Sequence, residues 1–188
     1  EESLQQAGVE YVKLGGIQPN PTDPKVYEGI ELARKEGVDF MLPVGGGSVI
    51  DTAKAIAAGV PYEGDFWDFY IGKAKVKKAL KVGVVLTIPA AGSEGSGNTV
   101  ITKLEGLQKL SLRVPELLRP VFAVMNPELT YSVSKYQTGA GTADIFAHTY
   151  MRYLTPDASF LGDQYCVGTL KTVVKYGPIA VNDPENYE

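Results

Sequence analysis

Residues 38–58 read VDFMLPVGGGSVIDTAKAIAA and contain the change of pattern that decides the fold. The stretch begins with a short apolar run, long enough for a buried β-strand, and three glycines, 45–47, follow at once. From Val49 onward, apolar residues recur at helical spacing. We therefore predict a strand, a glycine turn and a helix in immediate succession.

The glycine turn has the chemistry of a phosphate-binding site. Ser48 stands where an N-cap belongs, and Asp51 three residues later completes a capping-box pattern. Glycines let the backbone approach a ligand closely. The free amides at a helix start, with the positive end of the helix dipole, favour an anion such as a phosphate. The alternative is a tight turn that only links a strand to a helix.

Composition and charge exclude several classes of function. The chain has 188 residues, of which 44% are hydrophobic and 21% charged, as in ordinary globular proteins. Its net charge of -4 gives no reason to expect nucleic acid or a membrane as partner. The lone cysteine, Cys166, cannot form an internal disulfide, and no stretch approaches the roughly 20 apolar residues of a membrane span. We expect a cytoplasmic protein with a small-molecule ligand.

Short apolar segments on either side of the glycine turn predict a mainly parallel sheet. A helix is expected over about 25–35, and the remaining strands are expected at 9–14, 82–88, 98–102, 109–113 and 121–125. This alternation is typical of an α/β, Rossmann-like sheet with helices on both faces. A second small-residue loop, 89–97, follows the strand at 82–88. Both glycine-rich loops should therefore meet at the carboxyl edge of the sheet, where such folds bind ligands.

The pattern becomes helical after residue 130. One helix is expected over 135–154 and a second over about 159–176, closed by Gly177 and Pro178. We predict an α/β domain over 1–130 and the beginning of an all-helical domain over 131–188.

Asp144 and His148 lie four residues apart on the first of these helices. Their side chains therefore point to the same side, and a carboxylate oxygen and an imidazole nitrogen could reach one metal ion. The apolar neighbours of Asp144 favour a buried carboxylate with a partner. The alternative is a hydrogen bond on the helix surface, because a protein metal centre usually has at least three ligands.

Tyr131 and Lys135 match the Y-x-x-x-K proton-relay pair of short-chain dehydrogenases. Only two residues are specified, and that family places spaced glycines after its first strand. The pattern alone does not favour this relay.

Several motifs occur in order and together resemble the iron-containing (group III) alcohol dehydrogenases. The four main motifs are GGGSVIDTAK at 45–54, LTIPAAGSE at 86–94, PELT at 127–130 and DIFAH at 144–148. GIQPNP at 16–21 and YGPIA at 176–180 fit as well, and PAAGSE at 89–94 is similar to the NADPH-dependent butanol dehydrogenase branch. The resemblance covers essentially all of the chain.

The resemblance implies an N-terminal dinucleotide-binding domain, a C-terminal helical domain, and a divalent metal, iron or zinc, between them. The residues that it implies on the side of the cofactor, NADP or NAD, are Gly46, Gly47, Ser48, Asp51, Thr87, Ala90, Lys109 and Leu129. Asp144 and His148 would be the first two metal ligands, with two histidines supplied by later helices. The implied reaction is hydride transfer between NAD(P)H and a short-chain aldehyde or primary alcohol.

The ends of the chain bear on this expectation. The start reads like the second half of a helix that ends at Gly8, and the last residues are polar and turn-forming. We therefore expect a fragment of a longer protein, homodimeric at full length. Two alternatives stay open: a truncated, non-catalytic nucleotide-binding chain, and a lyase similar to dehydroquinate synthase, which the AGSE motif at 91–94 disfavours.

Overall fold

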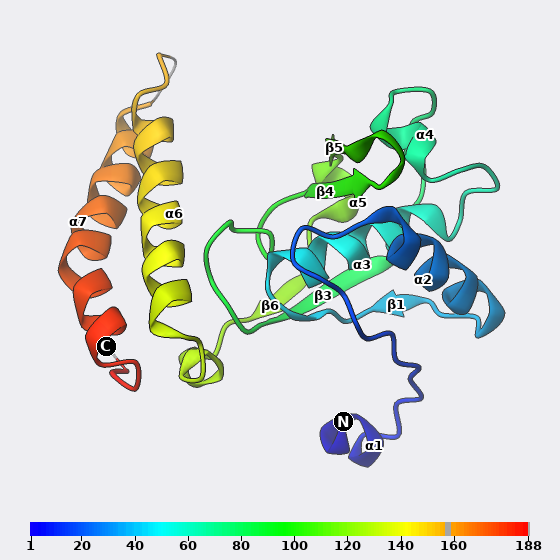
Figure 1. Ribbon diagram of the computed structural model, residues 1–188, viewed down its shortest axis with the longest axis horizontal. Helices are drawn as coiled ribbons and strands as arrows, with labels where there is room; N and C mark the ends of the chain where they lie inside the picture. The colour runs from blue at the N-terminus through cyan, green and yellow to red at the C-terminus, as the bar shows by residue number, and fades with distance from the viewer. Residues whose placement is uncertain (157–158, 188) are drawn as a thin grey trace.

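The computed structural model describes residues 1–156 and 159–187. It consists of an α/β part followed by two long helices (Figure 1). The main, four-stranded sheet of the α/β part is parallel throughout. Its central strand is β3 (Lys81–Leu86), with β1 (Phe40–Met41) and β2 (Val44–Gly45) along one side and β6 (Phe122–Val124) along the other. The predicted α/β class with a mainly parallel sheet is confirmed.

The strand predicted just before the glycine turn is present as two short pieces, β1 and β2. Both pair with β3 in one register, because Phe40 lies opposite Lys81 and Val44 lies opposite Val85. The interruption contains Pro43, which has no N–H to donate, although its carbonyl accepts a 3.0 Å hydrogen bond from the Val85 amide. The two pieces therefore act as one edge strand that leads directly into the turn.

Helix α3 (Gly47–Gly59) forms the centre of the core. All of its residues from 52 to 59 are buried, as expected of a helix enclosed on several sides. Val82, Val84 and Leu86 of β3 pack against Ile50 and its neighbours on one side of α3. On another side lies α2 (Asp23–Lys35), which confirms the helix predicted there.

Helices α2 and α3 cover one face of the sheet (Figure 1). The opposite face carries large apolar side chains, all between 39% and 59% exposed: Phe40, Val44, Phe122 and Val124. Within the described part of the chain, no second layer of helices covers this face, so the expectation of helices on both faces is met on one.

Two further strands form a separate sheet. β4 (Asn98–Lys103) and β5 (Gln108–Arg113) pair antiparallel around the short helix η1 (Glu105–Leu107). The predicted strand at 9–14 is wrong: these residues have no regular secondary structure and pair with no strand among the described residues, and Val9 and Val12 are exposed. Alternating apolar and polar residues do not form a β-strand when no neighbouring strand is available for hydrogen bonding. Short helices α1 (Glu2–Gln6), α4 (Trp67–Tyr70) and α5 (Pro115–Leu118) complete the α/β part.

The C-terminal part is a pair of antiparallel helices, α6 (Lys135–Tyr153) and α7 (Phe160–Asn182), reached through η2 (Pro127–Thr130). The predicted end of the second helix at Tyr176 is wrong, because α7 continues through Gly177 and Pro178. A Cβ at Gly177 would lie 2.4 Å from Cγ2 of Thr142, so α7 packs closely on α6 at this glycine. Among the described helices, none has the length and apolar character needed to cross a bilayer.

Candidate functional site

The three glycines of the turn have different surroundings. A Cβ at Gly45 would come within 2.6 Å of the Val49 side chain, and one at Gly46 within 2.2 Å of Ile88 Cγ2. A Cβ at Gly47 would meet nothing within 4 Å. The first two glycines are therefore required by packing, whereas the third leaves open space beside its backbone, where a ligand could approach.

Helix α3 begins two residues earlier than the capping-box pattern predicts, because that pattern placed the N-cap at Ser48. Gly46 is the N-cap, and its carbonyl accepts the amides of Val49 and Ile50 at 3.0 and 3.1 Å. The predicted capping box is wrong, since no side chain caps this helix and the Asp51 carboxylate is bound elsewhere. The amides of Gly47 and Ser48 lie in the first turn, whose N–H groups have no partner within a helix. Such amides can bind an anion, and the space around the Cβ position of Gly47 is open.

Asp51 lies on the inner side of α3 and contacts the second glycine-rich loop. Its Oδ1 accepts a 2.5 Å hydrogen bond from the Ser93 hydroxyl, and its Oδ2 accepts a 2.9 Å bond from the Val100 amide. Burial raises the pKa of the Asp51 carboxyl, against the effect of these two donors and of Lys54. Both carboxylate oxygens are thus engaged within the protein.

Lys54 is a feature that the sequence reasoning missed. Its side chain is completely buried, and Nζ donates to the carbonyl oxygens of Ser93, Ser96 and Asn98 at 2.6, 2.8 and 3.0 Å. The Ser93 hydroxyl lies 3.1 Å from the same nitrogen. Burial lowers the pKa of Lys54 to about 8, while Asp51 and Glu94 act in the opposite direction. The available signal was its position four residues after Ile50, on the buried stripe of the helix.

The second loop starts beside the glycine turn, as predicted. The Thr87 amide donates a 3.2 Å hydrogen bond to the Gly45 carbonyl, and Ile88 packs on Gly46. The loop then reaches α6: a Cβ at Gly141 would lie 2.9 Å from the Pro89 carbonyl oxygen and 3.6 Å from Ala90 Cβ. The segment 87–90 therefore lies between the glycine turn and the helix that carries the predicted metal ligands.

Asp144 and His148 follow Gly141 by three and seven residues, so all three lie along one stripe of α6. Asp144 Oδ1 and His148 Nε2 are 3.7 Å apart, with the side chains 42% and 52% exposed. The predicted burial of Asp144 is therefore wrong, because α6 packs mainly on α7 and leaves this side open. Among the described residues, no group of three or more His, Cys, Asp and Glu side chains could hold a metal ion.

Two other predicted cofactor residues lie further out. Lys109 is on the exposed hairpin strand β5, and its Nζ donates a 2.8 Å hydrogen bond to Asn20 Oδ1. Asn20 has a left-handed backbone, φ 56°, a conformation that asparagine tolerates better than most residues. The sequence reasoning assigned no role to Asn20, although it belongs to the GIQPNP motif. Leu129 lies exposed in η2, next to Thr130, which lines a cavity.

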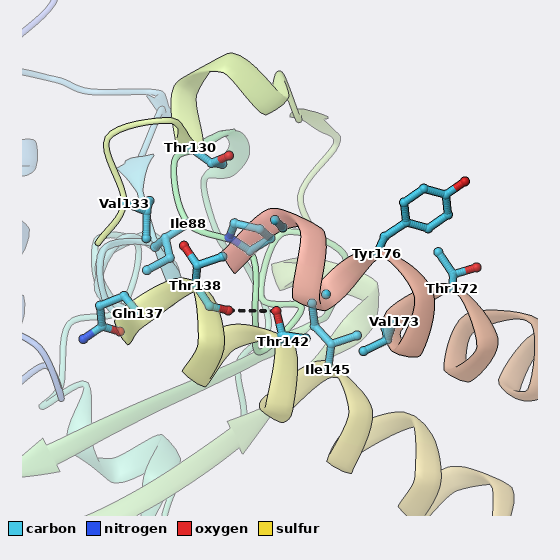
Figure 2. Close-up of a pocket in the computed structure, with 13 residues that line it drawn as sticks. Ile88, Thr130, Val133, Gln137, Thr138, Thr142, Ile145, Thr172, Val173 and Tyr176 are labelled. Carbon is cyan, nitrogen blue, oxygen red and sulfur yellow. Dashed lines mark hydrogen bonds between the residues drawn. The ribbon is translucent and has the colours of Figure 1, made fainter. Parts of the chain in front are cut away.

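That cavity encloses about 250 Å³ between the second loop, α6 and α7. Ile88 and Pro89 form its wall on the side of the glycine turn, and Figure 2 shows hydroxyl-bearing side chains of both helices around it. These are Thr138, Thr142, Thr172 and Tyr176, with a hydrogen bond from the Thr142 hydroxyl to the Thr138 carbonyl. The Y-x-x-x-K relay gains no support, since Lys135 Nζ donates to Asn182 Oδ1 at 2.9 Å on the surface.

The structure thus brings together a glycine turn at a helix start, a second loop packed against it, and a carboxylate–imidazole pair on the helix that this loop contacts. The sequence profile of the iron-containing alcohol dehydrogenases matches residues 1–127, about two thirds of the chain. The chain belongs to the iron-containing alcohol dehydrogenase family.

Particular relatives agree with this assignment. The chain is 40% identical over 186 residues to NADH-dependent butanol dehydrogenase A of Clostridium acetobutylicum. The matched region covers 98% of this chain and 48% of that protein. It is 37% identical over 185 residues to the NADPH-dependent aldehyde reductase YqhD of Escherichia coli, covering 96% of this chain and 48% of that one. The crystal structure of NADH-dependent butanol dehydrogenase A from Thermotoga maritima superposes with a TM-score of 0.95 at 39% identity, covering 99% of this chain and 46% of that chain. The chain thus spans about half the length of the relatives that it matches.

Proposed function

We propose that the protein encoded by the complete reading frame transfers hydride between NAD(P)H and a short-chain aldehyde or primary alcohol, with the help of a divalent metal. The observation that carries the proposal is the position of segment 87–90, which touches Gly46 on one side and Gly141 of α6 on the other. The relatives named as butanol dehydrogenases and as an aldehyde reductase support the same class of reaction. They do not favour the lyase alternative.

The glycine turn would hold the cofactor pyrophosphate. Gly46, Gly47 and Ser48 place the first amides of a 13-residue helix beside open space, which fits a diphosphate group. Thr87 and Ala90 would line the ribose and nicotinamide side, since they lie between this turn and α6. Lys109 and Leu129 would bind more distant parts of the cofactor. Asp51 has no free carboxylate oxygen for it and would act through the second loop.

Asp144 and His148 would supply two ligands to the metal. Their half-exposed side chains share one side of α6 and are free to turn toward an ion, iron or zinc, whose remaining ligands must come from outside the described residues. Such a metal, when bound, polarises a carbonyl group or lowers the pKa of an alcohol. We propose 1–130 as the cofactor-binding domain and 131–188 as the first part of the metal-binding one. We also propose a homodimeric, cytoplasmic protein, which gel filtration and cell fractionation would test.

The experiment is an assay of NADPH and NADH oxidation with butyraldehyde, using the protein from the complete reading frame, before and after metal removal. We expect activity that returns with Fe²⁺ or Zn²⁺, and a loss of about 100-fold or more in Asp144→Ala and His148→Ala. Asp163→Ala, which removes a carboxylate from the first turn of α7, is the matched control and should retain activity. Metal-independent turnover that survives both substitutions would contradict the proposal.

The alternative of a non-catalytic nucleotide-binding chain is tested separately. Equilibrium dialysis of residues 1–188 against Zn²⁺ should show weak binding, because two ligands rarely hold a metal tightly. Tight, stoichiometric binding by these residues alone would mean that the site is more complete than Asp144 and His148 indicate.

A further inference from the structure

We propose that Lys54 is a positioning residue, which fixes the conformation of the loop 93–98 and thereby the cofactor-binding edge of the sheet. The inference rests on the proposed function for its consequence, but its structural part does not depend on which ligand binds. The basis is one buried ammonium group in contact with three carbonyl oxygens of a single loop.

The loop cannot hold its shape alone. The stretch from Gly92 to Gly97 contains three glycines, and Gly92 has a φ of 76°, which only glycine adopts easily. Two long backbone hydrogen bonds lie within the loop, from the Gly95 amide to the Gly92 carbonyl at 3.2 Å and from the Ser96 amide to the Ser93 carbonyl at 3.4 Å. An external group is therefore needed to select one conformation from the many that such a sequence can adopt.

Lys54 provides that group from a rigid element. It lies in the middle of α3, and its three N–H donors match the carbonyls of Ser93, Ser96 and Asn98. Asp51, one turn earlier on the same face, binds Ser93 Oγ and the Val100 amide. The two side chains thus hold the far end of the loop, and no buried side-chain polar atom of the described residues is left without a partner.

The near end of the same loop is the segment that would face the cofactor. Thr87 is fixed to Gly45 by the strand pairing, and Ile88 packs on Gly46. Between these fixed points and Ser93 run only Pro89 to Gly92, of which Pro89 and Ala90 lie against Gly141. If Lys54 releases the far end, these residues lose their position against the glycine turn, although neither Lys54 nor Asp51 needs to touch the cofactor.

The test compares Lys54→Met, which keeps the length of the side chain and removes the donors, with Val26→Ala. Val26 is fully buried in α2, away from the loop, so Val26→Ala lowers stability without changing the hydrogen bonds of Lys54 and Asp51 to the loop. The first readout is amide hydrogen exchange of residues 91–98 without ligand. We expect faster exchange in Lys54→Met and exchange close to wild type in Val26→Ala.

The second readout is the Kd of NADPH and NADH by fluorescence titration, with KM and kcat for the protein from the complete reading frame. We expect Lys54→Met to raise the cofactor Kd and KM about tenfold with a smaller change in kcat, and Val26→Ala to leave both within about twofold. If Lys54→Met does not fold, Ser93→Ala removes the hydroxyl contacts to Lys54 and Asp51 alone and should raise the Kd about threefold. Unchanged exchange and an unchanged Kd in folded Lys54→Met, or in Ser93→Ala where the first variant fails, would overturn the proposal.

The two proposals fail in different ways. A wild-type protein that binds neither NADPH nor NADH overturns the proposed function, while the exchange of residues 91–98 still decides whether Lys54 fixes the loop.

Discussion

At the scale of single residues, neighbouring residues of the glycine turn and of α3 have different surroundings and therefore different roles. Gly46 and Gly47 are adjacent, but one is pressed against Ile88 and the other faces open space. Asp51 and Lys54 lie one turn apart, and both use their charge inside the protein instead of presenting it to solvent. The free energy of these contacts therefore has to be measured one substitution at a time.

The two glycines give opposite predictions for the same substitution. Gly46→Ala places a methyl group where Ile88 Cγ2 already lies and should lower the free energy of unfolding by about 1–3 kcal/mol. Gly47→Ala should leave stability unchanged or raise it by up to about 1 kcal/mol, because alanine favours a helix. It should still weaken NADPH binding, since the methyl group enters the space beside the first amides. Urea unfolding and a fluorescence titration of each variant provide the measurement, and equal stability losses would contradict this description of the turn.

The buried ammonium of Lys54 predicts a pH dependence of stability. Its pKa is about 8 in the folded chain and roughly 10.4 when unfolded, so between these values the unfolded state binds more protons. The contribution of Lys54 to the free energy of unfolding therefore rises with pH across this window, by about 1–3 kcal/mol in total. Asp51 and Glu94 are the charged groups that face it and oppose the shift.

Urea unfolding of wild type and Lys54→Met at about pH 7.5, 8.5 and 9.5 isolates this contribution. The stability difference, wild type minus variant, should increase with pH. A difference that is flat or that falls would show that Lys54 is not desolvated as described.

At the scale of helices and strands, close packing explains where glycine is needed. Gly177 lies against Thr142, so Gly177→Ala should force α6 and α7 apart and cost about 1–3 kcal/mol. Rotating Thr142 away would break the bond of its hydroxyl to the Thr138 carbonyl. Gly168→Ala, in the same helix with nothing within 4 Å of its Cβ position, is the matched control and should stabilise the helix by about 0.5–1 kcal/mol. Thermal unfolding of both variants decides the point, and a stabilised Gly177→Ala would contradict it.

The sequence predicted those elements whose signal is local. The glycine turn, α2 and α6 follow from periodicity and small residues, and their order along the chain placed both glycine-rich loops at one edge of the sheet. The predicted strand at 9–14 and the end of α7 at Tyr176 failed because each depends on a distant neighbour: a ladder partner that is absent from the described residues, and the contact of Gly177 with Thr142.

The site was predictable to a similar degree. Motif resemblance supplied Gly46, Gly47, Asp144 and His148 as candidates, and the structure brings their segments together through 87–90. Motif resemblance could not predict that the Lys54 side chain is buried, because a lysine in a helix is normally exposed. Its burial becomes evident only from its three carbonyl partners in the structure.

At the scale of the whole molecule, the segment 87–90 joins the glycine turn to the helix that carries Asp144 and His148. The sheet positions the turn, helix α6 positions the backbone of Asp144 and His148, and residues 87–90 lie between the turn and α6 (Figure 1). The chain belongs to the iron-containing alcohol dehydrogenases, in agreement with this arrangement. The TM-score of 0.95 to a butanol dehydrogenase structure shows that the backbone has the fold of the family.

The most direct test is a crystal structure of the protein with NADPH and Zn²⁺ bound. We predict pyrophosphate oxygens within hydrogen-bonding distance of the Gly47 and Ser48 amides, the nicotinamide ring next to Ala90, and the metal ion bound to Asp144 and His148 on the same side of α6. A nucleotide bound away from the glycine turn, or a metal ion bound without either of these two side chains, would contradict this prediction.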